Sequence, residues 1–119
     1  MKTSKTIAIG VMPQVKLRER VLAIACGDYK PKASDPKIWF TSMKTAADVL
    51  SDENRALLRT IAETRPVSIA ALAAETGANV RRMSRTLHTL SRYGLVDLLP
   101  SGTSLRPVTQ GATYRIVVC

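Results

Sequence analysis

The sequence predicts a mainly α-helical α+β fold, in which consecutive helices are followed by a β-hairpin. Three observations predict it. Serine or asparagine stands directly before several segments whose apolar residues recur with helical spacing. Short β-prone segments bounded by turn residues lie on either side of these helices. The chain of 119 residues, 45% hydrophobic and 23% charged, has the length and composition of one compact folded domain.

The first 40 residues predict a strand and a helix outside the main domain. Residues 2–12 alternate apolar and polar side chains and precede Pro13, which predicts a strand. Pro13 suits the first turn of a helix over 14–26, which has one broad apolar side and stops at Gly27. Residues 28–37 contain two prolines and three lysines and predict an extended linker. We therefore divide the chain into an N-terminal region, 1–40, and a main domain, 41–119.

The main domain begins with a series of predicted helices over 43–50, 52–64, 69–76 and 79–93. Residues that favour helix starts stand at their beginnings: Ser42, Ser51, Ser68 and Asn79. Arg65-Pro66 ends the second helix, Gly77 forms a turn, and Gly94 stops the last helix. Residues 95–99 and 105–108 predict a hairpin around a tip at 100–104, and 114–118 predict a final strand.

Charge and residue inventory narrow the possible functions. A formal net charge of +9 favours polyanionic partners, nucleic acid first and an anionic membrane or acidic protein next. No apolar run approaches the roughly 20 residues of a membrane span, and charged residues interrupt any signal-peptide core, so we expect a cytoplasmic protein without membrane contact. Cys26 and Cys119 lack metal-ligand spacing, and His88 is the one histidine. We expect no metal, no cofactor and no enzymatic activity.

The helix over 79–93 carries the strongest functional signal. With Val80 at 0° on a helical projection, the apolar side chains centre near about 310°, and the arginines lie on the opposite side, near about 130°. No Asp or Glu occurs between Glu75 and Asp97. A solvated basic face is the alternative reading. A helix, a Gly77 turn, an arginine-rich helix and a hairpin together favour a helix-turn-helix that presents its second helix to the major groove of DNA. The candidate DNA-binding residues are Ser68, Asn79, Arg81, Arg82, Ser84, Arg85, His88, Thr89, Arg92 and Arg106.

Residues 51–96 resemble the winged helix-turn-helix of prokaryotic transcriptional regulators of the MarR/ArsR type, above all in TGANVRRMSRTLHTLSRYGLV, residues 76–96. The segments IAIG, PKIWF, LSDENRALL and SRTLHTLSRYGLV are also similar to a group of small prokaryotic DNA-binding proteins, some of them encoded as antitoxins beside a toxin gene. The resemblance implies a winged fold with a recognition helix over about 79–93 and a wing over about 95–108. It departs from the pattern at residues 109–113.

Two functions follow as expectations. The first is a sequence-specific regulator that binds double-stranded DNA as a homodimer, with the dimer contact on the strand over 6–12 and the helix over 14–26. The second is an antitoxin-like protein whose residues 1–40 bind a toxin while the main domain represses its own operon. Trp39 and Phe40 also allow two readings: core anchors for the N-terminal region, which we favour, or a stacking arm for single-stranded bases.

Overall fold

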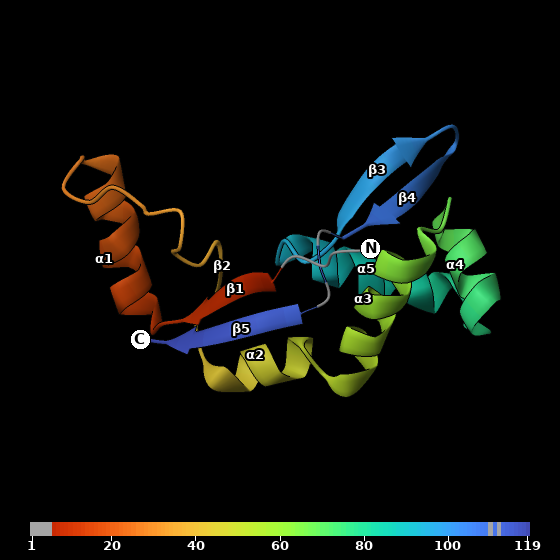
Figure 1. Ribbon diagram of the computed structural model, residues 1–119, viewed down its shortest axis with the longest axis horizontal. Helices are drawn as coiled ribbons and strands as arrows, with labels where there is room; N and C mark the ends of the chain where they lie inside the picture. Colours follow the sequence, from red (N-terminus) through yellow and green to blue (C-terminus); the bar gives the residue numbers. More distant parts are fainter. Residues whose placement is uncertain (1–5, 110, 112) are drawn as a thin grey trace.

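The computed structural model describes residues 6–109, 111 and 113–119, which form five helices and five strands. In chain order these are β1 (Thr6–Val11), α1 (Gln14–Ala25), β2 (Ile38–Phe40), α2 (Met43–Val49), α3 (Asp52–Thr64), α4 (Ile69–Thr76), α5 (Val80–Arg92), β3 (Asp97–Ser101), β4 (Ser104–Val108) and β5 (Thr113–Val118). The fold is mixed α+β, as predicted. The molecule is elongated, 47 × 30 × 27 Å, with α1 at one end, α4 and the β3–β4 hairpin at the other, and a small sheet between them (Figure 1).

The small sheet is parallel and joins distant parts of the chain. β1 is its central strand and pairs with β2 on one side and with β5 on the other. Ile9 lies opposite Ile38 and Ile116, and Val11 lies opposite Phe40 and Val118. Ile9, Val11, Ile38 and Phe40 are buried, so this face of the sheet forms part of the core. The sheet therefore fastens the N-terminal region to the end of the main domain. β2 and this pairing were not predicted from the sequence.

The helices α2 to α5 complete the core beside this face. Their buried side chains include Leu58, Ile61, Leu72, Leu87 and Leu90. The Phe40 ring lies 4.9 Å from the Tyr93 ring, centroid to centroid, and so links β2 to the end of α5. All four predicted caps are confirmed, because the side chains of Ser42, Ser51, Ser68 and Asn79 each accept a hydrogen bond from a backbone N–H of the following turn.

The β3–β4 hairpin is displaced from its predicted position. Leu95 and Val96, predicted as strand, are buried in the core, and β3 begins only at Asp97. The predicted tip over 100–104 was too long, since Pro100 lies within β3 and Ser101 pairs with Ser104. Proline is compatible with an edge strand because its missing N–H need not face a partner.

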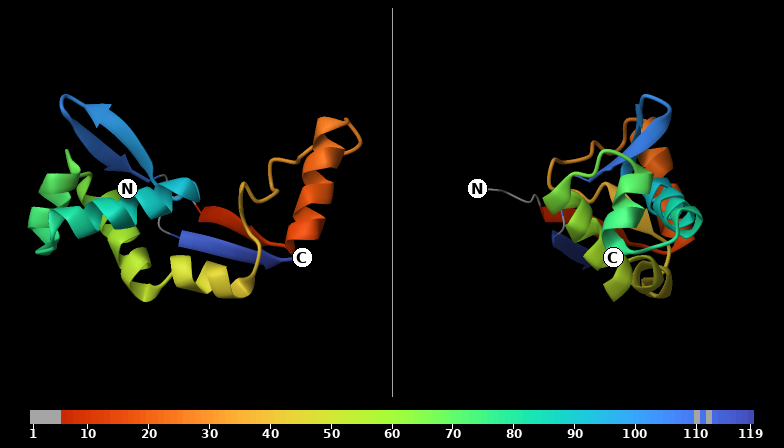
Figure 2. Two further views of the ribbon diagram at one scale, coloured as in Figure 1. Left: turned by 180° about the vertical axis from the view of Figure 1, so that it is seen from behind. Right: turned by 90° about the vertical axis from the view of Figure 1, so that its right-hand side faces the viewer.

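The helix α1 extends away from the sheet and has no buried residue (Figures 1 and 2). Its inner side is held by Arg20, whose guanidinium lies 5.0 Å from the centroids of both the Tyr29 and Trp39 rings and 3.4 Å from the Asp35 carboxylate. The Tyr29 hydroxyl also donates to Asp35, and this bond, with that from the Lys32 backbone N–H, holds the pKa of Asp35 below its usual value. The predicted linker is thus folded back onto α1.

The Trp39 ring lies between Arg20 of α1 and Gly10 of β1. A Cβ atom at position 10 would lie 2.2 Å from the Trp39 ring, so only glycine allows the ring to lie this close to β1. Trp39 is half-buried, whereas Phe40 is 1% exposed. Phe40 is therefore the core anchor of the two, and Trp39 supports α1 from the opposite face of the sheet.

Candidate functional site

The site is built on α5, whose orientation is fixed by its apolar face. Met83, Leu87 and Leu90 are buried, so the opposite side of the helix faces solvent. The first turn is capped by Asn79, whose Oδ1 accepts hydrogen bonds from the backbone N–H groups of Arg81 (2.9 Å) and Arg82 (3.2 Å). Gly77, in the left-handed conformation, ends α4 and allows the chain to turn into α5.

The solvent-exposed side of α5 is strongly basic. Arg81, Arg82, Arg85 and Arg92 are all exposed. Within the described residues, none of these four guanidinium groups lies within 4.0 Å of a carboxylate. Their charges are therefore not neutralised by the protein itself, and they are available to an anionic partner.

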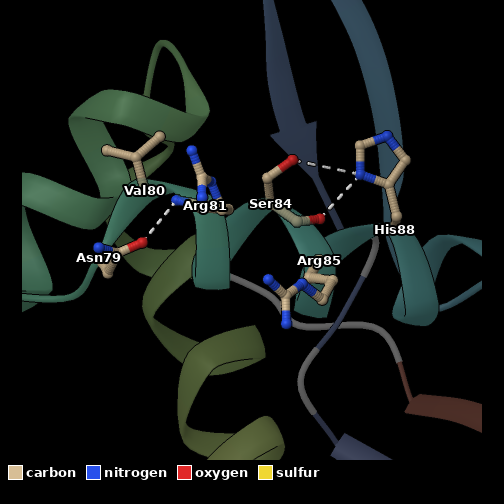
Figure 3. A pocket seen from close by; sticks show the side chains of 6 residues that line it. All are labelled: Asn79, Val80, Arg81, Ser84, Arg85 and His88. Atoms are coloured by element: carbon tan, nitrogen blue, oxygen red, sulfur yellow. Dashed lines mark hydrogen bonds between the residues drawn. The ribbon is translucent and has the colours of Figure 1, made fainter.

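An open hollow of about 940 Å³ lies along the first half of α5 (Figure 3). Its lining consists of Asn79, Val80, Arg81, Ser84, Arg85 and His88. The His88 Nδ1 lies 2.7 Å from the Ser84 backbone oxygen and 3.4 Å from its Oγ. Because a carbonyl oxygen can only accept, Nδ1 carries the proton in this contact and Nε2 is left as the second hydrogen-bonding atom of the ring.

The predicted site residues fall into three groups. Asn79, Arg81, Ser84, Arg85 and His88 come together around the hollow, and Arg82 and Arg92 lie on α5 outside it. The remaining candidates are separated from it or already occupied by local contacts. The Ser68 Oγ caps α4 through the Ala71 N–H at 3.0 Å, the half-buried Thr89 donates to the Arg85 backbone oxygen, and Arg106 lies on β4 opposite Leu99.

Val80 belongs to the site but was absent from the predicted set. Its side chain is 50% exposed and lines the hollow beside Arg81. On the helical projection Val80 lies between the apolar and basic faces. Its position in the first turn of α5 is the feature of the sequence that could have identified it as a site residue. An exposed valine among arginines adds an apolar contact surface to the hollow.

The described part of the chain contains neither a cluster of metal ligands nor a membrane-spanning helix. Residues 6–109, 111 and 113–119 contain no group of three or more His, Cys, Asp or Glu side chains that could hold a metal ion. Cys26 and Cys119 are exposed free thiols. Across the same residues, no helix combines the length and apolar character needed to cross a membrane.

The fold and this surface define a mixed α+β protein with a basic helix face. A sequence model of the HVO_A0114 family matches residues 49–116, more than half of the chain, and the protein belongs to this family. The match spans α3, α4, α5 and the hairpin, and thus the whole of the basic face. No curated protein and no solved structure matches the chain.

Proposed function

We propose that the protein is a transcriptional regulator that binds double-stranded DNA sequence-specifically, without cofactor or enzymatic activity. In this proposal α4, the Gly77 turn and α5 form a helix-turn-helix, and the β3–β4 hairpin is its wing. The observation that carries the proposal is the exposed face of α5, which bears no carboxylate and four arginines without an ion-pair partner among the described residues. A helix of this kind fits the major groove, where guanidinium groups reach both base edges and phosphates.

The position of each arginine along α5 suggests its role. Arg81 and Arg82 lie in the first turn and Arg85 one turn further, at the centre of the exposed face. In helix-turn-helix proteins the first turns of the second helix contact base edges, so these three are the candidates for reading sequence. Arg92, in the last turn, is assigned to the phosphate backbone.

The hairpin supports this arrangement by its attachment to α5. Leu95 and Val96, directly after the helix, are 2% and 1% exposed and anchor the start of the hairpin in the core. Arg106 is exposed on β4. A rigidly anchored hairpin with an exposed arginine suits a wing that contacts the phosphate backbone beside the helix.

Duplex binding is expected to weaken steeply with salt. If the four arginines of α5 each neutralise one phosphate, the slope of log K against log salt is roughly −3.6. This corresponds to a loss of roughly a hundredfold in affinity between about 50 and 200 mM salt. Fluorescence anisotropy with a labelled duplex measures it. An affinity that does not change over this range would contradict the proposal.

A second candidate function, binding of a protein partner such as a toxin through residues 1–40, is favoured by one observation. On the outer side of α1, Val15, Val21 and Leu22 are 65%, 57% and 59% exposed. Apolar side chains gathered on a projecting helix are typical of protein contacts. This function is compatible with DNA binding, because α1 and α5 lie in different parts of the molecule (Figure 2).

A further inference from the structure

The outer edge of β5 is the feature of the fold that most requires a partner. β5 is an edge strand of the parallel sheet, and no strand of the described chain pairs with its outer side. Its sequence, TYRIVV, has high β propensity and contains no proline and a single charge. Natural edge strands are usually protected by prolines, charges or bulges. The hairpin has such protection in Pro100 and Pro107, whereas β5 has only the single charge of Arg115.

We infer that two copies of the chain associate through this edge, with β5 pairing antiparallel to β5 of the second copy across a twofold axis. The inference deepens the proposed function by assigning the contact of the homodimer. Only the role of this dimer in DNA binding rests on the proposed function, because the contact itself is argued from the edge of β5.

The backbone of β5 shows which residues are available for pairing. The Cys119 N–H donates to the Val11 oxygen at 2.9 Å, and Val118 lies opposite Val11 in the register. In a parallel ladder, a residue exchanges hydrogen bonds with the two neighbours of the residue opposite it. Val117 and Cys119 therefore point their backbone N–H and C=O groups toward β1. By alternation along the strand, Tyr114, Ile116 and Val118 point their N–H and C=O groups outward.

One register satisfies all of these groups. A twofold axis perpendicular to the sheet places one residue of β5 opposite the same residue of the second copy. When the axis passes beside Ile116, Tyr114 lies opposite Val118 of the second copy. All three outward-pointing residues then form hydrogen-bonded pairs. Arg115 lies opposite Val117, so no like charges face each other, whereas centring on Arg115 would place two arginines together. The edge is therefore self-complementary, which favours a second copy over an unrelated strand.

The side chains at this edge extend the apolar surface of the sheet. Ile116 and Val118 are on the same face as Ile9 and Val11, yet they are 45% and 63% exposed. Met43, 49% exposed, lines with Tyr114 and Ile116 a groove of about 490 Å³ between α2 and β5, whose α3 side carries Arg55 and Arg59. Paired strands would continue the sheet, and its apolar face, from one copy into the other.

A stable dimer needs a larger contact than the edge of β5 alone. Specific dimers bury roughly 800 Å² per copy, which is more than one six-residue strand edge provides. The groove beside β5 supplies adjacent surface on the same face. The perpendicular twofold axis also keeps both α5 helices on the same side of the continuous sheet, since Tyr93 at the end of α5 packs on Phe40 of that face.

The first test compares two variants by light scattering and circular dichroism, without DNA. Ile116→Pro removes an outward N–H and leaves the ladder to β1 intact, so a folded monomer is expected from a dimeric wild type. Leu22→Glu, on the outer side of α1, is the matched control and should remain dimeric. A monomeric wild-type protein, or a dimer that Leu22→Glu separates and Ile116→Pro does not, would overturn the inference.

A cross-linking test decides the register and does not depend on the proline variant folding. In a Cys26→Ser, Cys119→Ser background, Ile116→Cys should form an intermolecular disulfide under mild oxidation. Its Cα atoms would lie about 5.5 Å apart, within disulfide range. Thr113→Cys is the control, because the two copies would be about 20 Å apart at this position. A dimer in which Thr113→Cys cross-links and Ile116→Cys does not would refute the register. Since neither test uses DNA, failure of this inference is distinguishable from failure of the proposed function.

Discussion

Replacing Arg81, Arg82 and Arg85 together by alanine is expected to lower the affinity for duplex DNA at least about a hundredfold. Each bidentate base contact contributes about 1–3 kcal/mol, so three contacts contribute at least about 3 kcal/mol. All three side chains are exposed, so the fold should be retained. Anisotropy titrations at one fixed salt concentration, with circular dichroism of the variant, measure both effects.

The matched control removes the same charge from elsewhere on the surface. Lys16, Arg18 and Lys30 are exposed on α1 and on the segment that follows it, away from the basic face. Their combined replacement by alanine should weaken binding only slightly, through the reduced long-range attraction. Equal losses in the two triple variants would mean that net charge, rather than the face of α5, accounts for binding.

The largest effect on stability is expected for Phe40→Ala. Phe40 is 1% exposed, packs against Tyr93 and connects β2 to α5. Truncating a buried phenylalanine costs about 3–5 kcal/mol, which is a large part of the roughly 5–15 kcal/mol that stabilises an ordinary domain. Denaturant unfolding of Phe40→Ala should therefore show a much lower midpoint, with partial unfolding in buffer as the extreme result.

Trp39→Ala serves as the neighbouring control. Trp39 is half-buried and contacts Gly10 and Arg20 on the other face of the sheet. Its loss should loosen α1 and cost less than the loss of Phe40. A Trp39 variant less stable than the Phe40 variant would show that the N-terminal region is held mainly from the α1 side.

The parts of the fold that could be predicted are those specified by neighbouring residues. The caps at Ser42, Ser51, Ser68 and Asn79 act within one helical turn, and each helix begins where its cap predicts. The parallel sheet depends on contacts between Ile9 and Ile116, more than a hundred residues apart. Local sequence patterns contain no information on such pairing. The three residues of β2 are too few for periodicity to identify them.

The expected dimer contact shows the same limit. The strand over 6–12 contains apolar residues in alternation, which is equally consistent with an exposed edge and with an inner strand. The structure places β1 at the centre of the sheet, where its whole length pairs with β5 and Ile9–Val11 pair with β2, so little of its edge is left for a second copy. Its partner β5 has the free edge instead.

The candidate site was more predictable because a single helix carries most of it. The 100° rotation per residue separates Arg81 and Arg85 from Leu87 in any α-helix, whatever its surroundings. The role of Ser68 as a cap could also be predicted. The spatial relation of Arg106 to α5 could not, because it depends on where the hairpin begins, and Leu95 and Val96 shift that start toward Asp97 by entering the core.

The central claim, that α5 reads base sequence from the major groove, is tested most directly by comparing Arg85→Ala with Arg92→Ala on two duplexes. One is the tightest binder selected from a random pool, and the other is of unrelated sequence. We predict that Arg85→Ala lowers affinity for the selected duplex by about 1–3 kcal/mol more than for the unrelated one, whereas Arg92→Ala weakens both alike. Equal losses on both duplexes for Arg85→Ala, with altered specificity for Arg92→Ala, would contradict this docking of the helix.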